Sequence, residues 1–230
     1  MNPERELQVI ASEVTACKKC PRLVDYREKV AREKRRAFRE SSYWGRGIPG
    51  FGDPRAKLFI LGLAPAAHGG NRTGRVFTGD RSGDFLFQAL YEAEFANQPT
   101  STNRDDGLQL RNAYIAAAVR CAPPANKPLP GEIQNCRVYL ERELAILKPT
   151  IILALGKIAW DAYLDLLRAD GKIASRAAYK FGHGVECAMP GGERLVGVYH
   201  PSQQNTQTGR LTPAMYRKVL QRIRISLSSS

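Results

Sequence analysis

A histidine stands at the end of an apolar run in the C-terminal part of the chain, and polar residues follow it. The stretch VYHPSQQNTQTGR, residues 198–210, places His200 directly after a run typical of a buried strand, with Ser202 and Asn205 close behind. An imidazole at a strand end can donate a hydrogen bond to negative charge that develops during a reaction. A histidine there is also common as a structural residue, so its type and position alone leave both interpretations open.

Four of the five cysteines have a spacing that suits ligation. Cys17 and Cys20 form a C-x2-C pair, Cys121 and Cys136 follow much later in the chain, and Cys187 stands apart. The N-terminus lacks a secretory signal pattern, so we expect reduced thiols that bind a metal or act in redox chemistry. By count, four thiolates suit Zn²⁺ and an iron–sulfur centre equally. Buried, unligated thiols are the alternative.

The chain carries a large excess of positive charge. It has 35 Lys and Arg residues against 22 Asp and Glu residues, which gives a formal net charge of +13. A cationic surface attracts a polyanion and gains free energy by releasing its counterions. Nucleic acid is therefore the first partner to consider and an anionic membrane the second, while a merely basic cytosolic enzyme is the alternative.

Four apolar segments predict the strands that must position these residues. Each is a nearly continuous apolar run, the pattern of a strand buried on both faces of a parallel sheet. Helical patterns alternate with them, so the sequence predicts an α/β fold: a three-layer α/β/α sandwich with a mainly parallel four-stranded central sheet. The strands are expected at residues 57–64, 112–121, 150–156 and 194–200, and helices at 3–14, 82–95, 130–147 and 212–227.

Unusual residues gather after three of these strands. GLAPAAHGGNRTGRVFTGD follows the first, RCAPPANKP the second and HPSQQNTQTGR the fourth. Because the carboxyl ends of parallel strands meet at one edge of a sheet, we expect the three loops to converge there and to carry the function. The sequence has neither a G-x-x-x-x-G-K-[ST] loop nor G-x-G-x-x-G after a strand, which argues against a Rossmann-like nucleotide hydrolase.

The length of 230 residues predicts a single domain over residues 1–230. Residues 27–47 form a basic arm, whose charges solvate one face or contact a partner. The serine-rich tail at about 226–230 is expected to be disordered. The longest apolar runs are far shorter than the ~18 residues that a membrane-spanning helix needs, so we expect no membrane contact.

Taken together, the motifs resemble those of the uracil-DNA glycosylase superfamily, and specifically its family 5, the type-B enzymes. The resemblance rests on GLAPAAHGGNRTGRVFTGD after the first strand, HPSQQNTQTGRLT after the last, and the four spaced cysteines, and it runs from Cys17 to about Arg217. It implies a DNA repair enzyme that flips uracil and other deaminated or damaged bases out of double-stranded DNA and hydrolyses the N-glycosidic bond. It also implies a structural [4Fe-4S] cluster whose ligands are Cys17, Cys20, Cys121 and Cys136.

The resemblance further implies roles for individual residues. His200 would stabilise the departing base, Asp80 and Asn126 would position the attacking water, and Phe77 would stack under the flipped base. Asp80 is otherwise an ordinary helix N-terminal residue, and Phe77 an ordinary core residue. The expected base-binding residues are Gly62, Ala64, Pro65, Ala66, Phe77 and Ala117, and the expected contacts to the DNA backbone are Ser202, Asn205, Gly209 and Arg210.

Two places depart from the better-known branches of the superfamily. Those branches carry an acidic or amide residue in the first motif and an asparagine on the second strand, whereas this chain has Leu63, Ala64 and Ala66 in the first place and Ala117 in the second. The departure is characteristic of family 5. Alanine imposes no penalty on a wrong base, so we expect activity on uracil, hydroxymethyluracil, ethenocytosine and hypoxanthine.

The sequence thus predicts a cytoplasmic, nucleoid-associated monomer that acts on lesion-containing duplex DNA. The motifs contain no lysine that could form a Schiff base, which favours a glycosylase without strand-cleaving activity. The alternative is a non-catalytic nucleic-acid-binding protein with a structural zinc. It accounts for the charge and the cysteines and leaves the converging loops unexplained.

Overall fold

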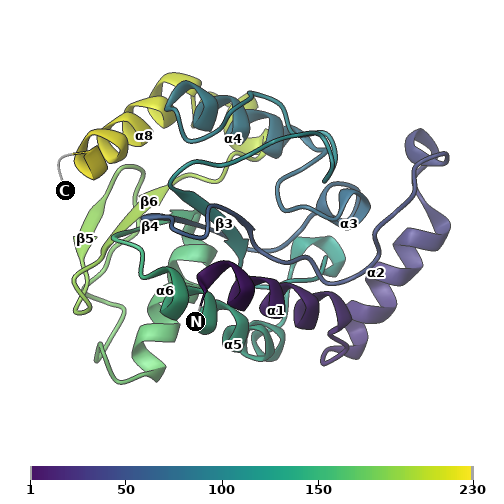
Figure 1. The fold of residues 1–230 in the computed structure, drawn as a ribbon, viewed down its shortest axis with the longest axis horizontal. Coiled ribbons are helices and arrows are strands. Elements are labelled where there is room, and N and C mark those ends of the chain that lie inside the picture. The colour runs from purple at the N-terminus through teal and green to yellow at the C-terminus, as the bar shows by residue number, and fades with distance from the viewer. Residues whose placement is uncertain (1, 229–230) are drawn as a thin grey trace.

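The computed structural model describes residues 2–228 and has an α/β fold built around one mixed sheet (Figure 1). The six strands lie in the order β1-β3-β2-β4-β6-β5. The four inner strands pair in parallel, and the two short edge strands pair antiparallel with their neighbours. The strands are β1 (Phe51–Gly52), β2 (Leu58–Gly62), β3 (Ala113–Ala117), β4 (Ile151–Leu155), β5 (Glu186–Ala188) and β6 (Arg194–Val198).

The inner strands are apolar because both of their faces are covered. All five residues of β2, β3 and β4 are buried, and so are four of the five residues of β6. Successive side chains point to opposite faces of the sheet, so Ile60 belongs to the core on one face and Leu61 to the core on the other. The register places Ile60 beside Ile115 of β3 and Leu153 of β4.

One face of the sheet is covered by α4 (Arg81–Glu92) and α8 (Pro213–Ser228). Leu86 and Leu90 of α4 and Tyr216 and Leu220 of α8 are buried against it. The other face is covered by α1 (Pro3–Ala16), α5 (Pro130–Leu147) and α6 (Lys157–Ala169). Figure 1 shows the sheet between these two groups of helices.

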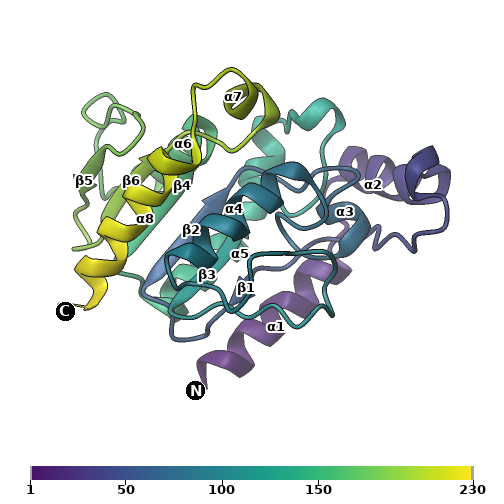
Figure 2. The same cartoon turned by 90° about the horizontal axis from the view of Figure 1, so that it is seen from above.

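The other helical segments are short or lie at the edge of the molecule, and Figure 2 shows α2 and α3 on one side of it and α7 apart from them, near the start of α8. These segments are α2 (Pro21–Glu33), the short 3-10 helix η1 (Arg36–Phe38), α3 (Gly70–Thr73), the 3-10 helix η2 (Pro124–Asn126) and α7 (Gln203–Gln207).

None of the helices between residues 2 and 228 is both long and apolar enough to cross a membrane.

The predicted number of four strands is wrong, because β1 and β5 extend the sheet at its two edges. Each has only two or three residues and neither is fully buried, so neither produces an apolar run that sequence reasoning could detect. The first part of the basic arm is the helix α2, whose C-terminal residue is Glu33. Residues 226–228, expected in a disordered tail, belong to α8, and residues 229–230 lie outside the described residues.

Candidate active site

A cavity of about 590 Å³ opens at the carboxyl ends of the inner strands. Loops after β2, β4 and β6 line it, together with the last residue of β3 and the segment that leads into α4. Nine of the residues singled out from the sequence come together there, although they lie far apart in the chain. They are Ala64, Pro65, Ala66, Phe77, Asp80, Ala117, Asn126, His200 and Ser202.

His200 lies just beyond the end of β6, where neighbouring residues fix its position. Asn205 donates a hydrogen bond from Nδ2 to the His200 carbonyl oxygen over 2.8 Å. Gly156, at φ +93°, permits a close approach, because a Cβ there would lie 3.2 Å from the His200 Cβ. Burial lowers the pKa of the imidazole, so the ring is neutral at pH 7 and offers an N–H donor. Its centroid lies 5.9 Å from that of Phe77.

Phe77 is held in a conformation that non-glycine residues rarely adopt. Its φ of +50° lies in the left-handed region, which costs energy and persists only where the surroundings enforce it. Two glycines leave the space for it here. A Cβ on Gly62 would lie 2.6 Å from the ring atom Cε2, and a Cβ on Gly83 would lie 1.9 Å from the Phe77 carbonyl oxygen. The ring is therefore fixed at the wall of the cavity, with Gly62 behind it.

Asp80 has two roles in the geometry. It is the N-cap of α4, where its Oδ1 accepts a hydrogen bond from the Gly83 backbone N–H over 2.9 Å. Its other oxygen, Oδ2, approaches Gly69 so closely that a Cβ there would lie only 2.1 Å away. Burial raises the pKa of the carboxyl group, against the lowering effect of the backbone hydrogen bonds. The cap role expected as the alternative is confirmed, and the same carboxylate also lines the cavity.

Asn126 lies at the exposed rim of the cavity, at the end of η2. It has a left-handed φ of +56°, and so does Ala125 before it at +53°. Asparagine tolerates this conformation, whereas alanine pays for the clash of its Cβ with the backbone. The turn thus stores strain beside the cavity and directs the asparagine toward it.

The loop between β4 and α6 also lines the cavity, which sequence reasoning missed. Gly156, Lys157 and Ile158 contribute to the wall, and the last two are the first residues of a helix of 13 residues. The backbone N–H groups at such a helix start favour negative charge. The sequence carried no signal for this, because the strand order, which puts β4 between β2 and β6 and its carboxyl end at the centre of the rim, is seen in the structure alone.

The expected DNA-backbone residues divide between the cavity and the surface beside it. Ser202 lines the cavity and caps α7, where its side chain accepts from the Asn205 N–H. Gly209 is exposed with a φ of +72°, and Arg210 places its guanidinium 4.8 Å from the centre of the Tyr199 ring. Asn205, Gly209 and Arg210 do not line the cavity, and their contacts with DNA stay predictions.

Three of the four spaced cysteines lie in an apolar cluster that reaches the wall of the cavity, because Ala64 packs against that cluster. Cys20, Cys121 and Cys136 belong to one buried apolar cluster, and Cys17 lies between α1 and α2. Cys17 and Cys136 lie close enough to Cys121 that a thiolate at either would raise the pKa of Cys121. Cys187 is on the distant edge strand β5.

Hydrogen-bond donors face the cysteine sulfurs. Arg27 Nη1 donates to the Cys121 sulfur over 2.8 Å, Asn135 Nδ2 to the Cys20 sulfur over 3.4 Å, and the Arg120 backbone N–H to the Cys136 sulfur over 3.5 Å.

Burial raises the pKa of Cys121 to about 11 and also raises that of Cys136. Both thiols are therefore protonated at pH 7 unless a metal displaces the proton. Within residues 2–228, no group of three or more His, Cys, Asp or Glu side chains is arranged to hold a metal ion. Two observations favour a metal centre: the four thiols are suitable metal ligands, and N–H groups donate hydrogen bonds to three of their sulfur atoms.

The comparison with known proteins agrees with this fold and cavity. A family model described as the Uracil DNA glycosylase superfamily matches residues 49–224, and the chain belongs to that superfamily.

Several relatives carry the name Type-5 uracil-DNA glycosylase. The protein of Mycobacterium tuberculosis is 52% identical over 204 residues, which cover 88% of this chain and 75% of the relative. The protein of Thermus thermophilus is 50% identical over 208 residues, 90% of this chain and 92% of the relative. The protein of Pyrobaculum aerophilum is 47% identical over 206 residues, 90% and 87% of the two chains.

Proposed function

We propose that this protein is a type-5 uracil-DNA glycosylase, which hydrolyses the N-glycosidic bond of uracil in double-stranded DNA and leaves an abasic site. The observation that carries the proposal is the cavity in which Phe77, Asp80 and His200 meet at the carboxyl edge of the sheet. A cavity of about 590 Å³ has room for a base and its sugar, and a base must leave the helix before it can enter. The name and high identity of the relatives support the same activity.

In this mechanism the flipped base rests against the Phe77 ring. As the bond from C1′ to the base nitrogen breaks, its electron pair moves onto the base, and the sugar gains positive character. The neutral His200 N–H donates to a base oxygen where the negative charge gathers. Donors fixed in advance toward developing charge account for a large share of such rate enhancements.

Asp80 serves as the group that positions the water. Its ionised carboxylate accepts a proton from the water as the water oxygen bonds to C1′, and the departing base takes a proton from solvent. Carboxylates in this role contribute about 10²- to 10⁴-fold in rate. Asn126, at the rim, orients the same water through its side-chain amide.

We infer a broad substrate range from the walls of the cavity. Ala64, Ala66 and Ala117 present methyl groups and no polar side-chain atoms to a bound base. A site gains strong selectivity when its buried polar groups are left unpaired by the wrong substrate, and methyl groups impose no such penalty. Hydroxymethyluracil, ethenocytosine and hypoxanthine are the expected further substrates.

We also propose that Cys17, Cys20, Cys121 and Cys136 hold a [4Fe-4S] cluster with a structural role. The cluster would tie α1 and α2 to the loop after β3 and to α5, behind Ala64 of the cavity wall. Thiolate ligation and N–H donors toward sulfur suit such a centre. Protein purified without oxygen should be brown and contain about four iron atoms per chain. A colourless protein with one zinc per chain would contradict this assignment.

The function is tested with end-labelled duplexes that each contain one lesion: uracil, hydroxymethyluracil, ethenocytosine, hypoxanthine or xanthine. The pure protein should release the base, and the strand should break only after alkaline treatment. Strand cleavage without alkali contradicts a hydrolytic glycosylase. Activity on uracil alone, at high enzyme concentration, contradicts the broad range and leaves the uracil activity intact.

A further inference from the structure

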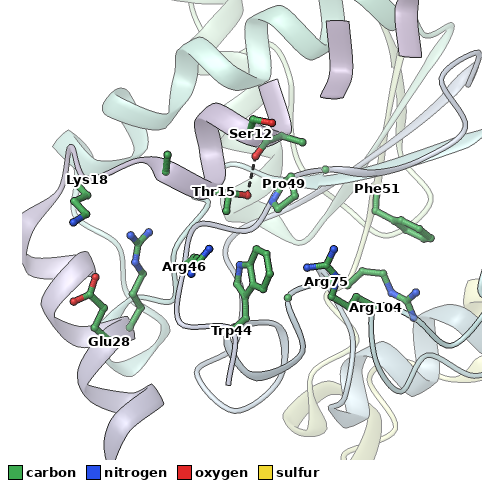
Figure 3. A pocket seen from close by; sticks show the side chains of 15 residues that line it. Ser12, Thr15, Lys18, Glu28, Trp44, Arg46, Pro49, Phe51, Arg75 and Arg104 are labelled. Atoms are coloured by element: carbon green, nitrogen blue, oxygen red, sulfur yellow. Dashed lines mark hydrogen bonds between the residues drawn. The ribbon is translucent and has the colours of Figure 1, made fainter. Parts of the chain in front are cut away.

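The cavity of about 590 Å³ that holds Phe77, Asp80 and His200 is called the base cavity. A second cleft of about 810 Å³ lies beside it and has no role in the mechanism above. It is formed by the C-terminal half of α1, by α2, by the segment before β1 and by the loop after α3. We call it the Trp44 cleft, because Figure 3 shows Trp44 in its middle, with Arg46 on one side and Arg75 and Arg104 on the other. Lys18 and Arg27 add two further cations to its lining.

The cations of the Trp44 cleft outnumber its acids. Glu28 is the acidic residue among its lining residues, against five Lys and Arg side chains. Two more carboxylates stand close by, because Arg104 pairs with Asp105 over 3.6 Å and Arg75 with Asp106 over 2.6 Å. The remaining cations give the cleft a net positive charge, which favours an anionic ligand.

Arg75 lies in the wall of the Trp44 cleft with one donor unpaired within residues 2–228, and its guanidinium lies 4.9 Å from the centre of the Phe51 ring. Its side chain is only 4% exposed, and it donates to Thr78, to Ser101 and to Asp106. Its remaining nitrogen, Nη1, is buried and has no hydrogen-bond partner among the described residues. Arg27 Nε, also buried in the lining, is unpartnered in the same way. A buried donor without a partner is costly, and an anion oxygen would satisfy it.

The Trp44 side chain is fixed in place and flanked by cations. Its Nε1 donates to the Gly47 carbonyl oxygen over 3.0 Å, and Gly74 packs against the indole so closely that a Cβ there would lie 3.1 Å from it. The Arg104 guanidinium lies 4.7 Å from the ring centre and that of Arg46 lies 5.7 Å from it. The indole therefore holds two exposed guanidinium groups at the mouth of the cleft.

We propose that the Trp44 cleft binds a backbone phosphodiester of the substrate DNA, outside the base cavity. The proposal rests on the proposed glycosylase function, which makes DNA the anionic partner at hand. Guanidinium groups match the geometry of phosphate oxygens, and several of them around one cleft are typical of contacts with a nucleic-acid backbone.

The two cavities share one loop, so the phosphate contact also bears on the base. Arg75 lines the Trp44 cleft, and the next residue, Val76, lines the base cavity. Arg75 Nε donates to Thr78 Oγ1 over 3.0 Å, directly after the stacking residue Phe77. A phosphate on Arg75 Nη1 would restrain the guanidinium and, through Thr78, the loop that carries Phe77.

The first test removes charge from the mouth of the cleft with the double variant Arg46→Gln and Arg104→Gln. Its control, Arg168→Gln with Lys172→Gln, removes the same charge from exposed residues at and just after the end of α6. The cleft variant should bind lesion-containing duplex roughly tenfold more weakly at low salt. The slope of the logarithm of its binding constant against the logarithm of the salt concentration should be smaller in magnitude by about 1 or more. The control variant should keep the affinity and the salt dependence of the unaltered protein.

Equal affinity and equal salt dependence of the two variants would overturn the proposal. If the unaltered protein does not excise uracil, the glycosylase function on which the proposal rests is overturned instead.

A second measurement uses the fluorescence of Trp44, since the other tryptophan, Trp160, is fully buried. Duplex DNA should protect the fluorescence from acrylamide quenching. Quenching that DNA leaves unchanged, or that inorganic phosphate reduces while DNA does not, contradicts a DNA phosphate in the cleft.

Discussion

The Cα of Gly62, the last residue of β2, lies against the ring edge of Phe77. A Cβ at residue 62 would come within 2.6 Å of Cε2 and 2.8 Å of Cζ of that ring. The Phe77 backbone cannot easily retreat, because Gly83 packs on its carbonyl oxygen. The absence of one side chain at residue 62 therefore sets how far the aromatic ring projects into the base cavity.

Gly62→Ala should slow base excision by roughly 10- to 100-fold, because it pushes the Phe77 ring into the space of the flipped base, and small displacements of positioning groups have effects of this size. Single-turnover kinetics on a uracil duplex measure the change. Gly131→Ala is the matched control, since a Cβ there meets nothing within 4 Å. Equal rates for the two variants would show that Phe77 does not stack on the base.

Asp80→Asn should lower the excision rate by about 10²-fold or more on every substrate, while asparagine preserves the cap of α4. The working form of Asp80 is ionised, and burial raises its pKa. The excision rate should therefore fall as the pH decreases, and the fall should begin at a higher pH than the ordinary pKa of an aspartate would give. In the Asp80→Asn variant the rate should not show this fall. Asp84→Asn, an exposed neighbour in the same helix turn, should keep the rate at high pH and the fall at low pH, with that fall moved to a lower pH because the Asp84 charge also raises the Asp80 pKa.

His200→Ala should slow excision by on the order of 10²-fold, and most for the bases that leave least easily, because anion stabilisation then carries more of the barrier. His200→Asn, which retains a side-chain N–H donor, should recover part of the loss. The lowered pKa keeps the imidazole neutral above pH 7, so titration of His200 should cause no change in the excision rate above pH 7. A uniform loss across all bases would assign His200 a structural role.

The buried ion pair of Arg120 and Glu143 offers a test of stability. Both side chains are 1% exposed, and two hydrogen bonds join them. Glu143→Gln leaves the guanidinium charge buried without its partner, which should cost about 3–5 kcal/mol, a decrease of roughly 6–20 °C in melting temperature. Glu141→Gln breaks a more exposed pair with Arg137 on the same helix and should change the melting temperature little.

Cys17→Ser should lower solubility and melting temperature more than it changes chemistry, because the four cysteines lie outside the lining of the base cavity and contact its wall through Ala64. Thermal unfolding and single-turnover rates of the folded fraction measure the two effects. Cys187→Ser, on the edge strand β5, is the matched control and should keep the iron content. A folded Cys17 variant with an unchanged melting temperature and no turnover would contradict a structural cluster.

The core strands could be predicted because burial on both faces produces continuous apolar runs. Leu58–Gly62 and Ile151–Leu155 lie within the predicted segments for this reason. The edge strand Glu186–Ala188 could not be, since two of its residues are exposed and its pairing depends on the neighbouring strand. The start of α2 at Pro21 carried the usual proline signal, but the density of charge after it favoured an arm.

The residues of the candidate site could be named from motifs, whereas their supports could not. His200 and Asp80 follow recognisable patterns, but nothing in the sequence indicates that Asn205 holds the His200 carbonyl group or that Gly69 leaves room for the Asp80 carboxylate. Such contacts join segments whose distance is set by the order of the strands. Arg27, taken as one charge of the basic arm, is in fact buried against the Cys121 sulfur.

The cysteines impose an order on the biosynthesis of the protein. Cys17 and Cys20 leave the ribosome early, whereas Cys121 and Cys136 belong to segments made more than a hundred residues later. At ordinary rates of translation this interval is on the order of ten seconds. Through that time the first two thiols have neither α5 to pack against nor their partner sulfurs. With the proposed cluster on these four thiols, delivery of iron and sulfide must follow synthesis of α5, and any earlier encounter of the nascent pair with a metal ion is a route to a misloaded chain.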